Sequence, residues 1–387
     1  MRMLVLGAGL QGSACAYDLL QNPDVSQVRL ADLRFDHLPE FLKPLSGPRL
    51  IPTTLDVRDR EAVLAVMRES DAVMSAIPYY LNLQLTEWAV EAGVHFCDLG
   101  GNTEIVFQQK ELADRAKAKG VTVIPDCGVA PGMVNILAEH GIRQLDTVES
   151  VRIYVGGLPQ KPEPPLNYQV VYSLEGVLDY YTTRSWVLRN GRRSQVTALS
   201  EREPVQFPAP VGTLEAFHTA GGLSTMAFRY EGKIPEMEYK TLRYPGHAEI
   251  METIRDLGLL DLDPVDLDGI KVSPRDVFVA AVGPKLAKKG KDLLALRVTV
   301  RGTKGGKPAE RRFDLVDRYD ETHGISAMMR TTGYSLSITG QMQARGEIVP
   351  AGVCTPDECI PPQRYIDELA KRGIMIAFRE EGPGVVV

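Results

Sequence analysis

Short apolar segments alternate with amphipathic ones over the first 125 residues of the chain. The run 72–77 is apolar at almost every position, which is typical of a strand buried on both faces. Apolar residues elsewhere recur at helical spacing, as Val63, Val66 and Met67 do. We predict six strands, at 3–6, 28–31, 50–52, 72–77, 94–97 and 121–124, and helices at 58–69, 81–92 and 103–119. Six such strands with right-handed crossovers form a doubly wound α/β sheet, the Rossmann fold.

Beyond Pro125 the pattern changes, because strand-like segments recur with fewer helices between them. These segments lie at 151–155, 169–172, 185–189, 226–230, 293–301 and 310–317. The turn at Asn190 and Gly191 and the glycine-rich stretch 302–306 predict hairpins, which join antiparallel strands. We therefore predict a second domain of α+β type with a mostly antiparallel sheet.

The C-terminal segment returns to a pattern of helix and strand. A helix is predicted over 325–345, interrupted near Gly333 and Gly340, followed by a helix over 361–372 and a strand over 374–378. Because a closing helix–strand unit is typical of the first domain, we expect 1–127 and 325–387 to form the Rossmann domain. Residues 128–324 then form the second domain, and a cleft between the two is the expected site for a small molecule.

A glycine-rich turn, GAGLQG, connects the first predicted strand to the first helix. Gly7 permits a tight turn, Gly9 lets the backbone approach a phosphate, and Gly12 lets the helix pack closely on the strand. With Leu10 and Gln11 these residues are the predicted binding site for a dinucleotide pyrophosphate, at a helix N-terminus that favours an anion. The alternative is a turn of the same shape that binds no nucleotide.

An acidic residue in the expected place supports the dinucleotide interpretation. Asp32 ends the second predicted strand, 20 positions after Gly12. A carboxylate there binds both ribose hydroxyls of NAD and repels the 2′-phosphate of NADP. We therefore expect NAD as the cofactor, while Arg34, which is able to accept that phosphate, leaves NADP as the alternative.

The segments that follow the strands are further candidates, because ligands of a doubly wound sheet bind outside the carboxyl ends of its strands. Ala76 and Pro78 follow the fourth strand and Gly100 follows the fifth, where small residues leave room for the cofactor. Asp56 follows the third strand and is suited to accept from the adenine amine or, equally, to cap a helix that begins at residue 58. For all of these positions, turn formation without a ligand is the alternative.

Composition removes several classes of protein from consideration. The chain has 387 residues, enough for two domains, and its 44% hydrophobic and 24% charged residues are ordinary for a soluble protein. The net charge of −6 provides no basic face, so we expect no nucleic-acid partner. No apolar run approaches the roughly 20 residues that span a membrane, and the N-terminus lacks the layout of a signal peptide. The five cysteines form no C-x-x-C pair or zinc pattern, so we expect reduced thiols, no metal and a cytoplasmic location.

The segment KTLRYPGH at 240–247 carries side chains suited to binding an amino acid. The guanidinium of Arg243 is able to bind a carboxylate through two hydrogen bonds, and His247 titrates near neutral pH. The alternative is that Arg243 faces solvent from a turn and that His247 caps the helix that follows it.

Six segments, in this order, resemble the saccharopine dehydrogenase-like family, and within it most closely the lysine 6-dehydrogenases. They are GAGLQG at 7–12, DCGVAPG at 126–132, GGLP at 156–159, NYQVVYSLEG at 167–176, LEAFHTAGG at 214–222 and KTLRYPGH at 240–247. The first segment is widespread, whereas the later ones in this order are more specific. The resemblance covers nearly the whole chain.

The resemblance implies a nicotinamide-dependent enzyme that acts on the side-chain nitrogen of an amino acid and forms at least a homodimer. For L-lysine, the reaction is oxidative deamination of the ε-amine to allysine and ammonia. Arg243, with the backbone around Thr219 and Gly222, is then expected to hold the α-carboxylate of the substrate. The chain departs from the pattern of the lysine enzymes at Tyr180 and Tyr181, where one tyrosine beside an acid is expected.

The same chemistry assigns expected roles to further residues of the pocket. Tyr168 and Tyr172 are expected along the aliphatic stem of the substrate, and Cys127 in the pocket wall. The substrate ammonium must lose a proton before hydride leaves its carbon, so a base or an apolar pocket is required. The candidate bases are Asp98, Glu175 and His247, and their order is left open.

Two other functions compete with lysine oxidation. The first is a dehydrogenase for a secondary amine such as saccharopine or a carboxylated polyamine. Saccharopine has three carboxylates, so its pocket requires further arginines, for which Arg152 and Arg184 are available. The second is a nucleotide-binding protein of the same fold without catalytic activity.

Overall fold

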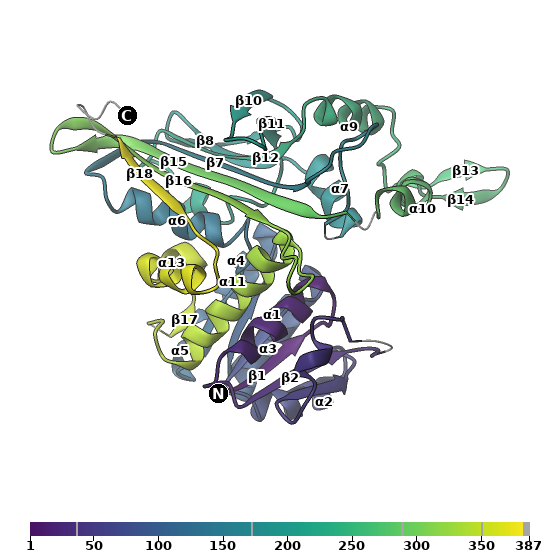
Figure 1. Ribbon diagram of the computed structural model, residues 1–387, viewed down its shortest axis with the longest axis vertical. Helices are drawn as coiled ribbons and strands as arrows, with labels where there is room; N and C mark the ends of the chain where they lie inside the picture. The colour runs from purple at the N-terminus through teal and green to yellow at the C-terminus, as the bar shows by residue number, and fades with distance from the viewer. Residues whose placement is uncertain (36–37, 172, 288–289, 350, 382–387) are drawn as a thin grey trace.

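The computed structural model describes residues 1–35, 38–171, 173–287, 290–349 and 351–381, and it contains two large β-sheets (Figure 1). The strands of the first sheet are β1 (Arg2–Leu6), β2 (Gln27–Asp32), β3 (Leu50–Thr54), β4 (Ala72–Ser75), β5 (His95–Asp98), β6 (Thr122–Ile124) and β17 (Gly352–Val353). Their order across the sheet is β17-β6-β5-β4-β1-β2-β3, and every neighbouring pair is parallel. The predicted doubly wound parallel sheet is confirmed, and β17, with two residues, is too short to show as a pattern in the sequence.

Helices cover both faces of this sheet, because alternate residues of a strand face opposite layers. The helices of this part are α1 (Leu10–Gln21), α2 (Arg60–Arg68), α3 (Asn82–Ala92), α4 (Thr103–Lys110), α5 (Ala113–Ala118), α11 (Ala327–Ala344), α12 (Pro356–Cys359) and α13 (Pro362–Lys371), with short 3-10 turns at Lys43–Leu45 and Tyr79–Leu81. Met3 and Val5 of β1 belong to the apolar cluster that contains α1 and α11. Leu4 and Leu6 belong to the cluster that contains α2 and α3.

The interruption predicted in the helix over 325–345 is wrong, because α11 runs unbroken from Ala327 to Ala344. Its two glycines are instead points of close packing. A Cβ atom on Gly333 would lie 2.6 Å from the carbonyl oxygen of Gln11, and one on Gly340 would lie 2.2 Å from the sulfur of Met74. The two glycines therefore let α11 lie close against α1 and β4.

The second sheet is mostly antiparallel, as predicted. Its strands are β7 (Thr147–Pro159), β8 (Ser185–Arg189), β9 (Arg192–Val196), β10 (Glu203–Gln206), β11 (Thr213–His218), β12 (Glu236–Arg243), β15 (Asp292–Lys304), β16 (Lys307–Arg318) and β18 (Ala377–Glu381). The main path is β10-β11-β12-β7-β15-β16-β18, in which only β12 and β7 pair in parallel within the described part of the chain. The helices here are α6 (Met133–Ile142), α7 (Leu174–Thr182), α8 (Met226–Arg229), α9 (His247–Asp256) and α10 (Pro274–Leu286).

Three predicted strands are wrong or differently placed. The segment predicted as a strand at 226–230 is the helical turn α8, in which Met226 and Ala227 are buried. The segment at 169–171 forms no strand, and residue 172 lies outside the described residues. The last strand, β18, does not return to the first sheet, because it pairs with β16 of the second one.

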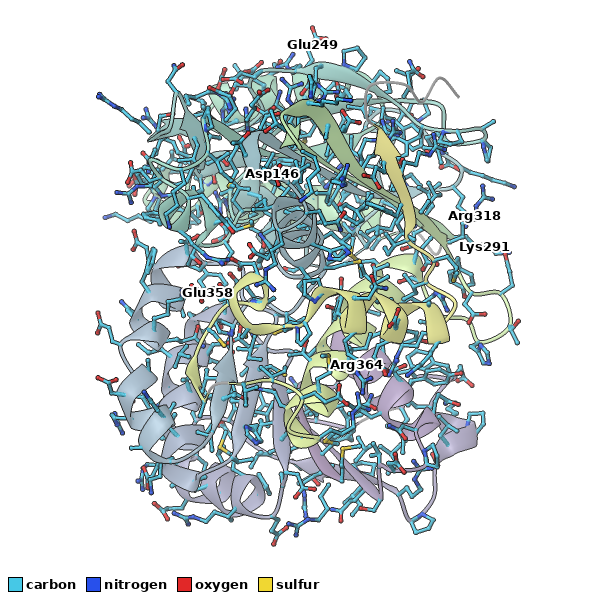
Figure 2. The ribbon with its side chains drawn as sticks, turned by 90° about the vertical axis from the view of Figure 1, so that its left-hand side faces the viewer. Asp146, Glu249, Lys291, Arg318, Glu358 and Arg364 are labelled. Carbon is cyan, nitrogen blue, oxygen red and sulfur yellow. The ribbon has the colours of Figure 1, made fainter. Side chains whose placement is uncertain are left out.

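A hairpin of β13 (Val265–Leu267) and β14 (Ile270–Val272) projects from the body of the second domain beside α10 (Figure 1). Elsewhere on the surface, acidic and basic side chains are interspersed, and those labelled in Figure 2 include Asp146, Lys291 and Arg364. Within the described residues, no helix has the length and apolar character needed to cross a bilayer.

Candidate active site

A cleft of about 530 Å³ lies between the two sheets, at the carboxyl ends of the strands of the first one. On that side it is lined by residues 76–80, 99–100 and 128–131, which follow β4, β5 and β6. On the other side it is lined by residues 155–157 of β7, by one face of α7, and by Tyr239, Thr241 and Arg243 of β12. The cleft therefore joins the expected nucleotide-binding edge to the expected substrate-binding segment.

The glycine turn has the geometry that a pyrophosphate site requires. Gly7 has a φ angle of +95°, and a Cβ atom there would lie 2.7 Å from the carbonyl oxygen of Ala76. A Cβ atom on Gly12 would lie 1.8 Å from the carbonyl oxygen of Gly7. Gly9 precedes α1, and a Cβ atom on it would meet nothing within 4 Å, so its backbone borders open space beside the helix N-terminus. The neighbouring Leu10 side chain is 54% exposed.

Asp32 lies at the end of β2, beside the glycine turn. Its Oδ2 atom accepts a hydrogen bond of 2.6 Å from the backbone N–H of Ala8. This bond fixes the carboxylate next to the turn that precedes α1, where the adenosine ribose of a dinucleotide lies in this fold. Arg34, the residue that leaves NADP as the alternative cofactor, is exposed.

Asp56 is less suited to adenine binding than the sequence suggested. Both of its carboxylate oxygens accept from the guanidinium of Arg58, at 2.9 and 2.7 Å, and this hydrogen bonding lowers the pKa of Asp56 to about 2. Nor does Asp56 cap the next helix, because α2 begins at Arg60 and its N-cap is Asp59. The carboxylate therefore forms a local ion pair at the protein surface.

Arg243 is buried in the wall of the cleft that β12 of the second sheet contributes. Its guanidinium lies 4.8 Å above the ring of Tyr168, donates from Nε to the hydroxyl of Tyr181 at 3.2 Å, and also donates to the carbonyl oxygen of Leu242. The alternative in which Arg243 faces solvent is wrong, because its side chain is buried and lines the cleft. A planar cation held in this way is suited to binding a carboxylate.

His247 lies behind Arg243 and does not line the cleft. Its Nε2 atom is 2.9 Å from the hydroxyl of Tyr181, and its Nδ1 atom is 3.0 Å from the carbonyl oxygen of Leu166. Burial, with a further contribution from Arg243, lowers the pKa of His247 to about 3. The imidazole is therefore neutral near pH 7, and it supports Tyr181, which in turn contacts Arg243.

Asp98 is fully buried beneath the floor of the cleft, and Asp126 lies next to it. Asp98 accepts from the side chain of Gln109 at 2.8 Å, and burial raises its pKa to about 7. Burial also raises the pKa of Asp126 to about 6, and Asp126 accepts from the Gly101 N–H at 3.0 Å. A Cβ atom on Gly100, which lines the cleft, would clash with Asp126, so the glycine is required there.

Three predicted substrate-binding residues, Cys127, Thr219 and Gly222, do not line the cleft themselves and lie behind residues that do. The Cys127 thiol points into the core, 3.1 Å from the carbonyl oxygen of Ile124, and burial raises its pKa. Thr219 is bonded to the hydroxyl of Thr241, which does line the cleft. Gly222 packs against the ring of Tyr239, where a Cβ atom would be 2.3 Å from a ring carbon. Tyr172 lies outside the described residues.

Of the three candidate bases, Glu175 is the one that lines the cleft in the described structure. It lies on the exposed first turn of α7, and Asp179 follows it one turn later on the same face. Asp179 is bonded at 2.5 Å to Arg275 of α10. Asp179, with Tyr180 beside it, was not among the predicted site residues, although helical spacing from Glu175 was a signal that placed it there.

Tyr239 and Thr241 were also missed by the sequence reasoning. They line the cleft because side chains two residues apart share one face of a strand, and Arg243 of β12 lies on that face too. Recognising 236–243 as a strand that includes Arg243 would have identified both residues.

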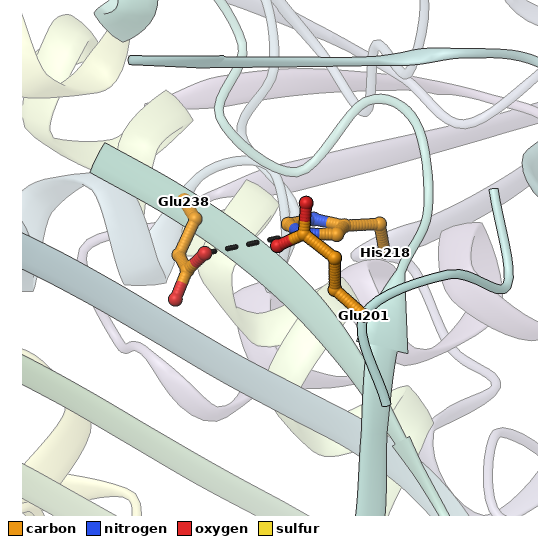
Figure 3. A group of neighbouring side chains, drawn as sticks. All are labelled: Glu201, His218 and Glu238. Carbon is orange, nitrogen blue, oxygen red and sulfur yellow. Dashed lines mark hydrogen bonds and ion pairs between the residues drawn. The ribbon is translucent and has the colours of Figure 1, made fainter. Parts of the chain in front are cut away.

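Outside the cleft, Glu201, His218 and Glu238 form a group whose ligand atoms lie within 4.8 Å of one another (Figure 3). The guanidinium of Arg189 donates to Glu201 at 2.8 Å and to Glu238 at 2.6 Å. The His218 Nε2 atom lies 3.1 Å from Glu201. Because a cationic side chain already bridges the two carboxylates, the group is an ion-pair network that ties β8 to β12.

The residues present suit a bound dinucleotide. The glycine turn, the helix N-terminus and Asp32 form the cradle for its adenosine and pyrophosphate groups, and Ala76, Pro78 and Gly100 leave room for the rest in the cleft. Fold and site thus define a protein with a Rossmann domain that binds NAD(P).

Comparison with known proteins gives the family. Residues 3–124 match the family model described as the saccharopine dehydrogenase NADP binding domain, and residues 128–374 match the saccharopine dehydrogenase C-terminal domain. The chain belongs to the saccharopine dehydrogenase family of oxidoreductases.

The relatives differ in how much of their length the chain spans. The saccharopine dehydrogenase [NADP(+), L-glutamate-forming] of Schizosaccharomyces pombe is 25% identical over 447 residues, covering 97% of this chain and 98% of the relative. The enzyme with that name from Saccharomyces cerevisiae is 26% identical, covering 76% of this chain and 66% of the relative. The mouse mitochondrial alpha-aminoadipic semialdehyde synthase is 28% identical, and the chain spans 28% of its length.

The fold also matches a solved structure along nearly its whole length. Apo saccharopine dehydrogenase (L-Glu forming) from Saccharomyces cerevisiae superposes with a TM-score of 0.79 at 21% identity, covering 98% of this chain and 99% of that one. This likeness confirms the arrangement of the two sheets.

Proposed function

We propose that the protein oxidises the ε-amine of L-lysine with NAD as hydride acceptor, giving allysine and ammonia. The proposal goes beyond the family assignment in naming a primary amine as the reacting group. Its main support is the set of charges that face the cleft.

Arg243 is the one lysine, arginine or histidine among the described residues that line the cleft. The carboxylate of Glu175 lines the same cleft, as does that of Asp179, which is paired with Arg275 of α10. L-Lysine has one carboxylate and a second, positively charged end, so this charge pattern complements it. Saccharopine has three carboxylates, and the two further arginines that the sequence offered do not face the cleft: Arg184 is exposed and Arg152 pairs with Glu238.

The reaction breaks a C–H bond at the ε-carbon of lysine. The neutral ε-amine loses hydride from this carbon to give an iminium ion, water adds to the iminium carbon, and ammonia leaves to give the aldehyde. The nicotinamide ring, when bound, supplies the hydride acceptor. The protein must hold the substrate at both ends and remove one proton from its ammonium group.

Arg243 is the proposed clamp for the α-carboxylate. Its guanidinium is fixed by Tyr168 and Tyr181, and Tyr181 is fixed in turn by His247, so little freedom is lost when a carboxylate binds. From this anchor the aliphatic stem would extend along the cleft, which Tyr180 and Tyr239 line, towards the edge of the first sheet.

Glu175 is the best supported of the three candidate bases, because it faces the cleft whereas Asp98 and His247 are buried behind its walls. A carboxylate beside the ammonium would hold it by charge, and the apolar residues of the cleft favour its neutral form. Since free lysine keeps its ε-ammonium up to a pKa of about 10.4, kcat/KM should rise as the pH increases above neutral.

Saccharopine oxidation is the second candidate function. It is favoured by the names of the relatives, which are saccharopine dehydrogenases that use NADP and form L-glutamate. That reaction would act on a secondary amine and release an amino acid in place of ammonia.

One assay separates the two functions. The protein is incubated with NAD or NADP and with L-lysine, cadaverine, 6-aminohexanoate or saccharopine, and reduced cofactor and ammonia are both measured. The proposal predicts turnover of L-lysine with one ammonia per reduced cofactor, and much less of cadaverine, which lacks the carboxylate. Turnover of saccharopine without ammonia, and none of lysine, would establish the second function.

A further inference from the structure

Gln11 has a buried amide group that has no hydrogen-bond partner among the described residues. It lies in the first turn of α1, two positions after Gly9, and is one of the residues that line the cleft. Both the Nε2 and Oε1 atoms are buried without a hydrogen bond. The amide therefore keeps an unused donor group and an unused acceptor in the wall of the cleft.

This arrangement is unfavourable unless a ligand completes it. A buried polar group left without a partner lowers the stability of the fold, and most buried polar groups in proteins have one. An apolar side chain of the same length, such as Met, would fill this position without that cost. The position of Gln11 is therefore better explained by ligand binding than by stability.

The surroundings of Gln11 show which part of a dinucleotide it faces. Among the described residues, those lining the cleft include Gln11, Ala76 and Pro78, whereas Gly9 and Asp32 do not line it. In a doubly wound fold the pyrophosphate lies at the helix N-terminus, and the acidic residue after the second strand binds the adenosine ribose. Gln11 thus faces the other half of the dinucleotide, which carries the nicotinamide.

We propose that the Gln11 amide pairs with the carboxamide of the nicotinamide ring. Two primary amides complement each other, because each has an N–H group to donate and a carbonyl oxygen to accept. Gln11 Nε2 would donate to the carboxamide oxygen, and Oε1 would accept from its N–H. Gln11 is then a positioning residue that fixes which face of the ring is turned towards the substrate.

The inference rests on dinucleotide binding and not on the choice of lysine as substrate. Its test therefore uses binding in the absence of any amine. Calorimetry compares the wild-type protein with Gln11→Met for three ligands: NAD, its 3-acetylpyridine analogue, in which a methyl ketone replaces the carboxamide, and ADP-ribose, which lacks the ring. Gln21→Met, at the exposed end of the same helix, is the matched control.

We expect the wild-type protein to bind NAD about tenfold more tightly than the acetylpyridine analogue, as one lost hydrogen bond implies. Gln11→Met should bind the two ligands equally, with ADP-ribose unchanged, and should unfold at the same or a higher temperature than the wild type without ligand. If Gln11→Met bound NAD and ADP-ribose equally more weakly than the wild type, the proposal would be overturned in favour of a contact between Gln11 and the ribose or pyrophosphate. Unchanged binding of all three would overturn it in favour of no ligand contact. If Gln11→Met does not fold, the comparison of NAD with the acetylpyridine analogue on the wild-type protein still tests the proposal, and equal affinities would overturn it.

Discussion

At the scale of single residues, the site depends on a few side chains whose surroundings are fixed. Arg243 illustrates this, since it is buried and contacts Tyr168, Tyr181 and Leu242 before any substrate is present. The sequence indicated Arg243 through the resemblance of its segment to a family, whereas its spacing alone also allowed a solvent-exposed turn. The sequence alone did not show which of the candidate bases Glu175, Asp98 and His247 faces the cleft, because this depends on how deeply each side chain is buried in the fold.

Replacing Arg243 tests the carboxylate clamp. Arg243→Lys keeps the charge but loses the planar fork, so kcat/KM for L-lysine should fall about 10- to 100-fold, mainly through KM. The dissociation constant for NAD should stay unchanged. Arg184→Lys, at an exposed position outside the cleft, is the matched control. An equal loss of lysine and NAD binding in Arg243→Lys would show a structural role instead.

Replacing Asp32 tests the choice of cofactor. Its carboxylate lies beside the turn that precedes α1 and should repel the 2′-phosphate of NADP. Asp32→Ser should therefore raise the ratio of kcat/KM for NADP over NAD by about tenfold or more. If the wild-type protein already prefers NADP, the cofactor given in the names of its two yeast relatives, the assignment of NAD is wrong.

Asp98 should make the stability of the protein depend on pH. Because burial raises its pKa to about 7, the folded protein binds a proton there at pH values where the unfolded chain does not. The contribution of Asp98 to the free energy of unfolding is thus fully present below about pH 4 and is lost as the pH rises to about 7. Relative to Asp98→Asn, the wild-type free energy of unfolding should decrease by up to about 4 kcal/mol across this range.

Chemical denaturation at a series of pH values measures this difference. Asp56→Asn is the comparison, because hydrogen bonding from Arg58 lowers the pKa of that carboxyl and its stabilising effect is lost as the pH falls. Wild type and Asp98→Asn curves that stay parallel from about pH 5 to pH 8 would show that Asp98 is ionised in the folded protein.

At the scale of elements, patterns predicted the first sheet better than the second. The central parallel strands β1 and β4 are buried on both faces and appear as continuous apolar runs, whereas β7, β15 and β16 are long and partly exposed. The helical turn α8 was mistaken for a strand because four residues are too few for a period to show. Gly333 and Gly340 were interpreted as breaks because their packing partners, in α1 and β4, are distant in sequence.

The packing role of Gly333 gives a prediction about α11. A Cβ atom there would lie 2.6 Å from the backbone oxygen of Gln11, which a side-chain movement cannot relieve. Gly333→Ala should therefore lower the free energy of unfolding by about 1–3 kcal/mol, measured in denaturant. Gly283→Ala, in α10, is the control, because its Cβ atom would make ordinary contact with Leu174 at 3.6 Å. A Gly333→Ala protein as stable as this control would show that α1 and α11 are not tightly packed.

At the scale of the whole molecule, function depends on the cleft that the two sheets form together. The nucleotide-binding edge comes from the first 131 residues, and Arg243 comes from β12 of the second sheet, so neither part contains the complete site. The sequence predicted the nucleotide-binding edge and the segment around Arg243. It did not predict the charges of the cleft, because these depend on α7 and β12 lining the same cleft. The homo-oligomer stays a prediction.

The central claim is that hydride leaves the ε-carbon of L-lysine. The most direct measurement uses L-lysine that carries two deuterium atoms on this carbon, with NAD and the wild-type protein, followed by mass spectrometry of the reduced cofactor. Each reduced cofactor should gain one deuterium, and the aldehyde product should keep the other. Reduced cofactor without deuterium, or deuterium transfer only from lysine labelled at the α-carbon, would contradict it.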